Sequence, residues 1–189
     1  MLDNVLAKRH CSFKVRLTVK SAVTLAAIAL AVALPELFHL LGRVTDIGTA
    51  LGETFLPMHI AVFAVGFIAG PVTGLVTGLA APAISFALSG MPSVVMLPYM
   101  IVELAAYGGV SGLLANVKMP TILKLFIAQV AGRELRAVAI CIGAYAFGSP
   151  VNVSVIWTSI VTGLPGLILQ WIILPLFMFW LARKVNADE

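Results

Sequence analysis

The chain has 189 residues, of which 61% are hydrophobic and 11% are charged, and its formal net charge is +4. Soluble domains contain about 45–50% apolar and about 25% charged residues, so this composition excludes an ordinary soluble protein. Because the basic residues gather near the ends of apolar segments, the positive charge is not interpreted as a nucleic-acid-binding surface.

The spacing of the charged residues indicates several membrane crossings. Between Glu53 and Glu103 lie 49 residues without a formal charge, and between Arg136 and Arg183 lie 46. A helix needs about 20 apolar residues to cross a bilayer, so each stretch can hold two crossings. The sequence therefore predicts an all-α, polytopic membrane protein with a single integral membrane domain over residues 1–189.

Six hydrophobic segments are predicted to be transmembrane helices. In chain order they cover residues 17–35, 56–69, 72–89, 94–114, 121–147 and 155–182. The second segment has only about 14 residues, which is short for a full crossing and also fits a re-entrant hairpin. We prefer six crossings because residues 50–55 can extend this helix.

Basic residues set the predicted orientation. Of the twelve Lys and Arg residues, five lie in the first 20 positions, two are Arg183 and Lys184, and two are Lys118 and Lys124. Since Lys and Arg favour cytoplasmic loops, both termini are predicted to be cytoplasmic, with residues 1–16 as a basic N-terminal segment. The connections at 36–53, 90–93 and 148–152 are then external.

Ionisable side chains within apolar segments are the first functional candidates, because they usually face a cavity or the bundle interior. Glu103 shares a helix face with Tyr99 and Tyr107. On the fifth segment, Arg133 shares a face with Arg136.

Each candidate has a structural and a functional interpretation. Glu103 and Arg133 could form a buried ion pair, or they could bind a polar ligand. Arg136 could extend toward the membrane–water interface or pair with Glu134. The two tyrosines could be packing residues or could stack on a ligand. His59 could be a polar cap outside the apolar zone or part of a binding site.

An alanine strip follows the first segment at four-residue spacing. Ala22, Ala26, Ala29 and Ala33 lie on one helix face, where small side chains allow another helix to approach closely. The strip could pack within this chain or bind another protein.

No catalytic or metal-binding motif is present in the sequence. It contains no phosphate-binding G-x-x-x-x-G-K-[ST] loop, no H-E-x-x-H and no G-x-S-x-G, and its three histidines lack metal-ligand spacing. We therefore predict no enzymatic activity, no cofactor and no metal, and any ATP-driven work would require a partner.

Three stretches together resemble a known family of membrane proteins. They read LPMHIAVFAVGFIAGPVTGLVTGLAAPAISFALSGMP, LPYMIVELAAYGGVSGLL and AGRELRAV, from Leu56 to Val138. In order and spacing they are similar to the substrate-binding S-components of energy-coupling factor (ECF) vitamin transporters.

The resemblance implies a fold, a function and partners. S-components are six-helix proteins of the prokaryotic cell membrane that capture a vitamin or related micronutrient from outside. They deliver it after binding a transmembrane coupling subunit that carries two ATPases. In this family the coupling subunit binds the small-residue strip of the first helix, which here is Ala22, Ala26, Ala29 and Ala33.

The resemblance also implies a ligand pocket beneath the external loops. Its predicted residues are Glu53, Met58, His59, Met91, Tyr99, Glu103, Tyr107, Arg133, Asn152 and Trp157. Aromatic walls with one acid and one base would suit a planar heterocycle with polar edges. The alternative function is a self-sufficient secondary transporter in which Glu103 couples a proton.

Overall fold

The computed structural model describes residues 17–46 and 50–185, so the predicted basic segment 1–16 lies outside the described residues. Over the described ranges all regular elements are helices and no strand occurs, which confirms the all-α prediction. The helices are α2 (Leu17–Val44), α3 (Ala50–Phe55), α4 (Pro57–Ala69), α5 (Pro71–Ser89), α6 (Leu97–Leu114), α7 (Thr121–Ala146) and α8 (Val155–Val185).

Five segments of the described chain are long and apolar enough to cross a membrane, which indicates a multi-pass protein. They are Thr24–Gly42, Gly52–Ala69, Pro71–Ser89, Leu97–Leu114 and Val155–Leu181. Helix α7 has 26 residues but carries Lys124, Arg133, Glu134 and Arg136, so it is not among the five. The sixth crossing stays a prediction.

Helix α2 is longer than predicted. The sequence interpretation ended it at Pro35, but the helix continues to Val44, so residues 36–44 of the expected polar connection are helical. A proline inside a helix removes one backbone hydrogen bond, a loss that membrane helices tolerate when neighbouring groups compensate. The apolar Leu37, Leu40 and Leu41 after Pro35 maintain the helical pattern.

The second predicted segment has the expected extension, with a break. Residues 50–55 form α3, and Leu56 then adopts the left-handed conformation (φ 49°, ψ 50°) before Pro57 begins α4. The break lets α3 and α4 differ in direction while Gly52–Ala69 remains long enough for a crossing. Helix α3 also contacts the last helix, α8, where a Cβ on Gly166 would collide with the backbone of Thr54 and Phe55.

The most extensive helix contact is between α5 and α6, and glycines make it possible. A Cβ atom on Gly74 would collide with the backbone of Gly108, and one on Gly78 would collide with the backbone of Leu104. Small residues at four-residue spacing allow this approach, which drives helix association in lipid. This packing fixes α6, which carries Glu103.

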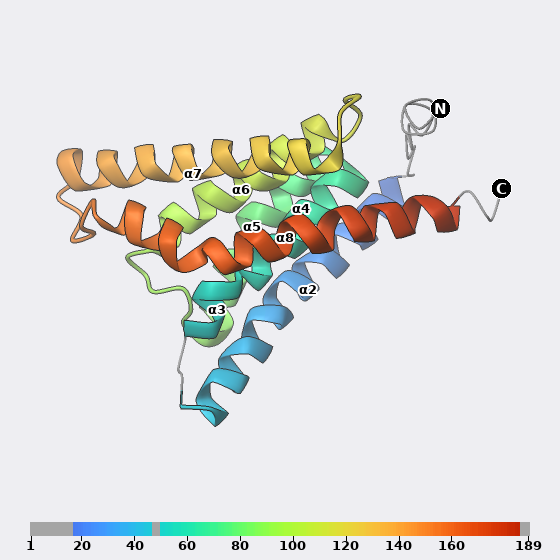
Figure 1. Ribbon diagram of the computed structural model, residues 1–189. Coiled ribbons are helices and arrows are strands. Elements are labelled where there is room, and N and C mark those ends of the chain that lie inside the picture. The colour runs from blue at the N-terminus through green and yellow to red at the C-terminus, as the bar shows by residue number, and fades with distance from the viewer. Residues whose placement is uncertain (1–16, 47–49, 186–189) are drawn as a thin grey trace.

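Figure 1 shows how the connections are distributed at the ends of the bundle. The start of α2, the end of α8 and the α6–α7 connection lie on one side, and the α5–α6 and α7–α8 connections lie on the opposite side. Helices α7 and α8 lie side by side on one flank. The assignment of the first side to the cytoplasm stays a prediction from the basic residues.

Candidate functional site

A cavity of about 400 Å³ lies where α2 ends, α3 and α4 meet, and α6 and α8 begin. Its volume is in the range of about 300–1,000 Å³ that small-molecule pockets have. Its lining comes from all seven described helices and the connection before α6. The lining residues are Pro35, His39, Gly52, Glu53, Leu56, Pro57, Met58, His59, Ser85, Met91, Pro92, Ser93, Met96, Met100, Glu103, Arg133, Arg136, Val155, Thr158, Ser159 and Thr162.

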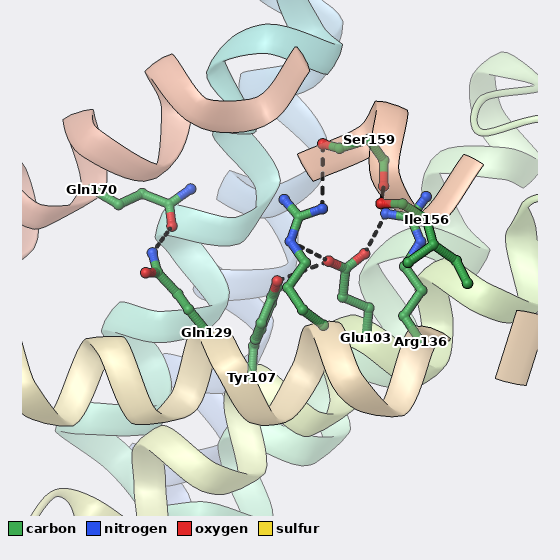
Figure 2. A network of polar contacts seen from close by, with 8 residues as sticks. Glu103, Tyr107, Gln129, Arg136, Ile156, Ser159 and Gln170 are labelled. Atoms are coloured by element: carbon green, nitrogen blue, oxygen red, sulfur yellow. Dashed lines mark hydrogen bonds and ion pairs between the residues drawn. The ribbon is translucent and has the colours of Figure 1, made fainter. Parts of the chain in front are cut away.

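Glu103 is the centre of a polar cluster in this cavity. Its Oε1 lies 3.3 Å from Arg133 Nε and accepts a 2.7 Å hydrogen bond from the Tyr107 hydroxyl. Its Oε2 accepts a 2.8 Å hydrogen bond from Arg136 Nη1. Figure 2 shows Tyr107 and Arg136 approaching the Glu103 carboxylate from two helices. The cluster therefore joins α6 to α7 through one buried carboxylate.

Arg136 does not pair with Glu134, so that sequence interpretation is wrong. Residues two apart on a helix point to different sides, whereas residues three apart are neighbours. Arg133 and Arg136 therefore both face Glu103, and Glu134 is exposed on the other side of α7. Gly132 permits the contact between the helices, because a Cβ there would collide with the Tyr107 ring.

Several buried donors in the cluster lack a hydrogen-bond partner. Arg133 Nη2 and Arg136 Nε are buried and unpaired, and Arg133 Nε is near Glu103 without hydrogen-bond geometry. Arg133 Nη1 makes only a long contact of 3.4 Å with the Ser159 carbonyl oxygen. The arginines thus keep hydrogen-bonding capacity beyond what Glu103 uses.

His59 lies inside the bundle and is not the polar cap that one interpretation suggested. Its side chain is buried, and its ring centroid lies 5.3 Å from that of Tyr107. Neither ring nitrogen has a hydrogen-bond partner. Because neutral imidazole has one donor and one acceptor nitrogen, His59 can offer both to a ligand in the cavity.

Six of the ten residues predicted for the pocket line the cavity, and four do not. Glu53, Met58, His59, Met91, Glu103 and Arg133 are lining residues. Tyr107 lies behind them, with its hydroxyl used by Glu103.

Tyr99, Asn152 and Trp157 lie elsewhere. The Tyr99 hydroxyl donates a 2.8 Å hydrogen bond to Ser149 Oγ, and Asn152 Oδ1 accepts one of 2.8 Å from the Ser154 amide. Trp157 is 69% exposed. The predicted aromatic wall is therefore not part of the cavity lining. The hydroxyl of each tyrosine donates a hydrogen bond to another side chain of the protein, and the tryptophan faces outward.

Methionines provide much of the apolar lining, and sequence reasoning missed two of them. Met58 and Met91 were predicted, whereas Met96 and Met100 were not. The signal was present, because Met96, Met100 and Glu103 follow the i, i+4, i+7 spacing of one helix face. Sequence spacing gave no comparable indication that Thr158, Ser159 and Thr162 of α8 line the cavity, since their position depends on how α8 packs.

A second polar bridge ties α7 to α8 outside the cavity lining. Gln129 Nε2 donates a 2.9 Å hydrogen bond to Gln170 Oε1, and Trp171 Nε1 donates one of 2.7 Å to Gln129 Oε1. The glutamine pair is visible in Figure 2. Such hydrogen bonds join helices in an apolar environment, so we interpret this bridge as structural.

The alanine strip is on the outer face of α2. Ala22, Ala26, Ala29 and Ala33 are all exposed, whereas Ala31 and Val32 are buried. Helix α2 packs against α4 and α5. Packing among the described residues therefore does not cover the strip.

Among the described residues, no three His, Cys, Asp or Glu side chains are grouped so that they could hold a metal ion. Comparison with protein-family models, curated proteins and solved structures finds no match to this chain. A functional assignment therefore depends on the cavity, the polar cluster and the exposed strip.

Proposed function

We propose that this protein is the substrate-binding subunit of a multi-subunit membrane importer of the ECF type. It captures a vitamin-like micronutrient from outside and delivers it with the help of a coupling subunit and two ATPases. The observation that carries the proposal is the cavity of about 400 Å³ that contains Glu103, Arg133 and Arg136 within a bundle of apolar helices.

Charged residues inside such a bundle support a binding role. They are rare within membrane segments, and those that occur usually face a cavity or mark a substrate pathway. Here all three contribute to one cavity, together with the buried His59. A bundle that only needed to hold its helices together could use uncharged pairs such as Gln129 and Gln170.

The inner boundary of the cavity supports capture of a solute more than free passage through a pore. Behind His59, the ring of Tyr107 packs on the ring of Phe63 with centroids 4.6 Å apart, and both side chains are fully buried. Further along the same helices, a Cβ on Gly66 or Gly112 would collide with neighbouring backbone. Release on the inner side would then require a conformational change.

The exposed alanine strip supports a protein partner for that change. Exposed small residues along a membrane helix allow close approach of another helix. The sequence has no phosphate-binding loop of its own. A coupling subunit bound to the alanine strip would provide the protein contact, and its ATPases would provide the energy for the conformational change.

Reconstitution tests the proposal against the alternative of a proton-coupled secondary transporter. The small molecule that remains bound after purification is identified by mass spectrometry and then offered, in labelled form, to liposomes. We expect uptake only when this protein is reconstituted with its coupling subunit and ATPases and ATP is supplied. Uptake by the protein alone under an imposed proton gradient would contradict the proposal and favour the alternative.

A further inference from the structure

We infer that the cavity binds a small organic acid whose single carboxylate lies against Arg133 and Arg136. The inference rests on the proposed function and narrows its ligand from any vitamin-like molecule to a monoanionic one. The sequence favoured a planar heterocycle with polar edges and specified no charge on it.

The buried end of the cavity has an excess of positive charge. Two guanidinium groups approach one carboxylate there, and the side chains of Arg133 and Arg136 are only 12% and 15% exposed. Glu53 also lines the cavity, but its side chain is exposed, whereas Glu103 is fully buried. Buried charge is costly unless it is paired, so one negative charge is needed to balance this cluster.

The unpaired donors indicate where that negative charge binds. Arg133 Nη2 and Arg136 Nε are buried without a hydrogen-bond partner. Guanidinium groups bind carboxylate and phosphate oxygens through pairs of N–H donors. A phosphate monoester carries a charge of about −1.5 to −2 at neutral pH, more than the single excess charge, so a carboxylate matches better.

The other lining residues indicate the chemistry of the part of the ligand beyond its carboxylate. Met58, Met91, Met96 and Met100 present flexible thioether side chains, which adapt to an apolar body of varied shape. His59 supplies two unpaired ring nitrogens that can hydrogen-bond one polar group on that body. The cavity is thus suited to an acid with an apolar middle and one further polar group.

Matched acids and neutral analogues test the inference on the wild-type protein. The probes are nicotinate and nicotinamide, biotin and biotinamide, and pantothenate and panthenol, in each of which only the carboxylate differs. We expect at least one acid to raise the Tm of the purified protein while its neutral partner does not. Because this comparison needs no variant, a folding defect cannot confound it.

Two variants of cavity residues test whether the carboxylate of the acid binds at Arg133 and Arg136. Arg133→Gln and Arg136→Gln each remove a charge-assisted hydrogen bond, so each should weaken binding of that acid by roughly 10- to 100-fold. The matched control is Arg183→Gln, which removes a positive charge from an exposed residue near the end of α8 and should leave Kd unchanged.

The outcomes separate this inference from the proposed function. A neutral analogue that binds as tightly as its acid overturns the inference and leaves the function in place. The same holds if Arg183→Gln weakens acid binding as much as the cavity variants do. If none of the three acids binds, the inference is overturned, whereas the proposed function stands or falls separately on ATP-dependent uptake by the reconstituted complex.

Discussion

Within the polar cluster of the described residues, Glu103 makes more hydrogen bonds and ion pairs than any other side chain. It binds Arg133, Arg136 and the Tyr107 hydroxyl, and it is fully buried. Without its charge, two guanidinium groups would remain against an apolar interior. The stability of the α6–α7 contact should therefore depend on this carboxylate.

We predict that Glu103→Gln destabilises the protein by about 3–5 kcal/mol, the usual cost of removing one partner from a buried ion pair. For a chain of this size the Tm should fall by on the order of 10 °C. Thermal unfolding in detergent, followed by fluorescence, measures the change. Tyr107→Phe removes only one hydrogen bond to the same carboxylate and should cost about 1.5–3 kcal/mol.

Glu134→Gln is the matched control for that prediction, because Glu134 is an exposed acid on the opposing side of α7. It should not lower the Tm. If Glu103→Gln were as stable as Glu134→Gln, the ion cluster would not contribute to the folded state.

For single residues, the sequence predicted which helix face a side chain occupies better than it predicted which side chain it contacts. Helical spacing alone placed Glu103 toward the interior and put Arg133 and Arg136 on one face, as observed. The partner of Arg136 was predicted wrongly, since proximity in sequence favoured Glu134 although its side chain points elsewhere. Which side chains meet across helices depends on helix rotation and separation, which the glycines at the contacts set.

Helix α7 carries a charged side chain, Glu134, in the middle of an exposed apolar face. Val130, Leu135 and Val138 are exposed around Glu134. A charged side chain at the centre of a membrane helix costs about 2.5–3.5 kcal/mol on insertion scales. Glu134 and the two cavity arginines together explain why α7 is not among the five strongly apolar segments.

We predict that Glu134→Leu stabilises the isolated protein, because it extends the apolar face of α7 without touching the cavity. Its Tm should rise by roughly 2–4 °C for each kcal/mol gained. Val138→Leu, an apolar change one turn away, is the control and should have little effect. A lower Tm for Glu134→Leu would contradict this account.

Helix boundaries were predictable where composition changes sharply. The starts and ends predicted for the third, fifth and sixth segments lie within a few residues of α5, α7 and α8. The end of α2 was predicted wrongly because Pro35 was interpreted as a stop, although the apolar pattern continued beyond it. The shape of the cavity could not be predicted, since seven helices and a connection contribute to it.

At the scale of the whole molecule, α2 connects the exposed alanine strip with the cavity. Its exposed alanines occupy positions 22–33, while Pro35 and His39 further along the same helix line the cavity. The helix has 28 residues, which corresponds to a length of about 42 Å. A partner bound along the strip would therefore contact the helix that also forms one wall of the cavity.

We predict that Ala26→Leu combined with Ala29→Leu leaves ligand affinity unchanged and abolishes co-purification with the coupling subunit. Both alanines are exposed on α2 and outside the cavity lining, so larger side chains there should block only the approach of another helix. Two measurements check this, namely ligand Kd on the purified protein and co-purification with the coupling subunit. Ala83→Leu, which enlarges an exposed alanine on α5, is the control and should preserve both. Intact co-purification of the double variant would show that the partner binds a different face, whereas a raised Kd would show that the strip and the cavity are not independent.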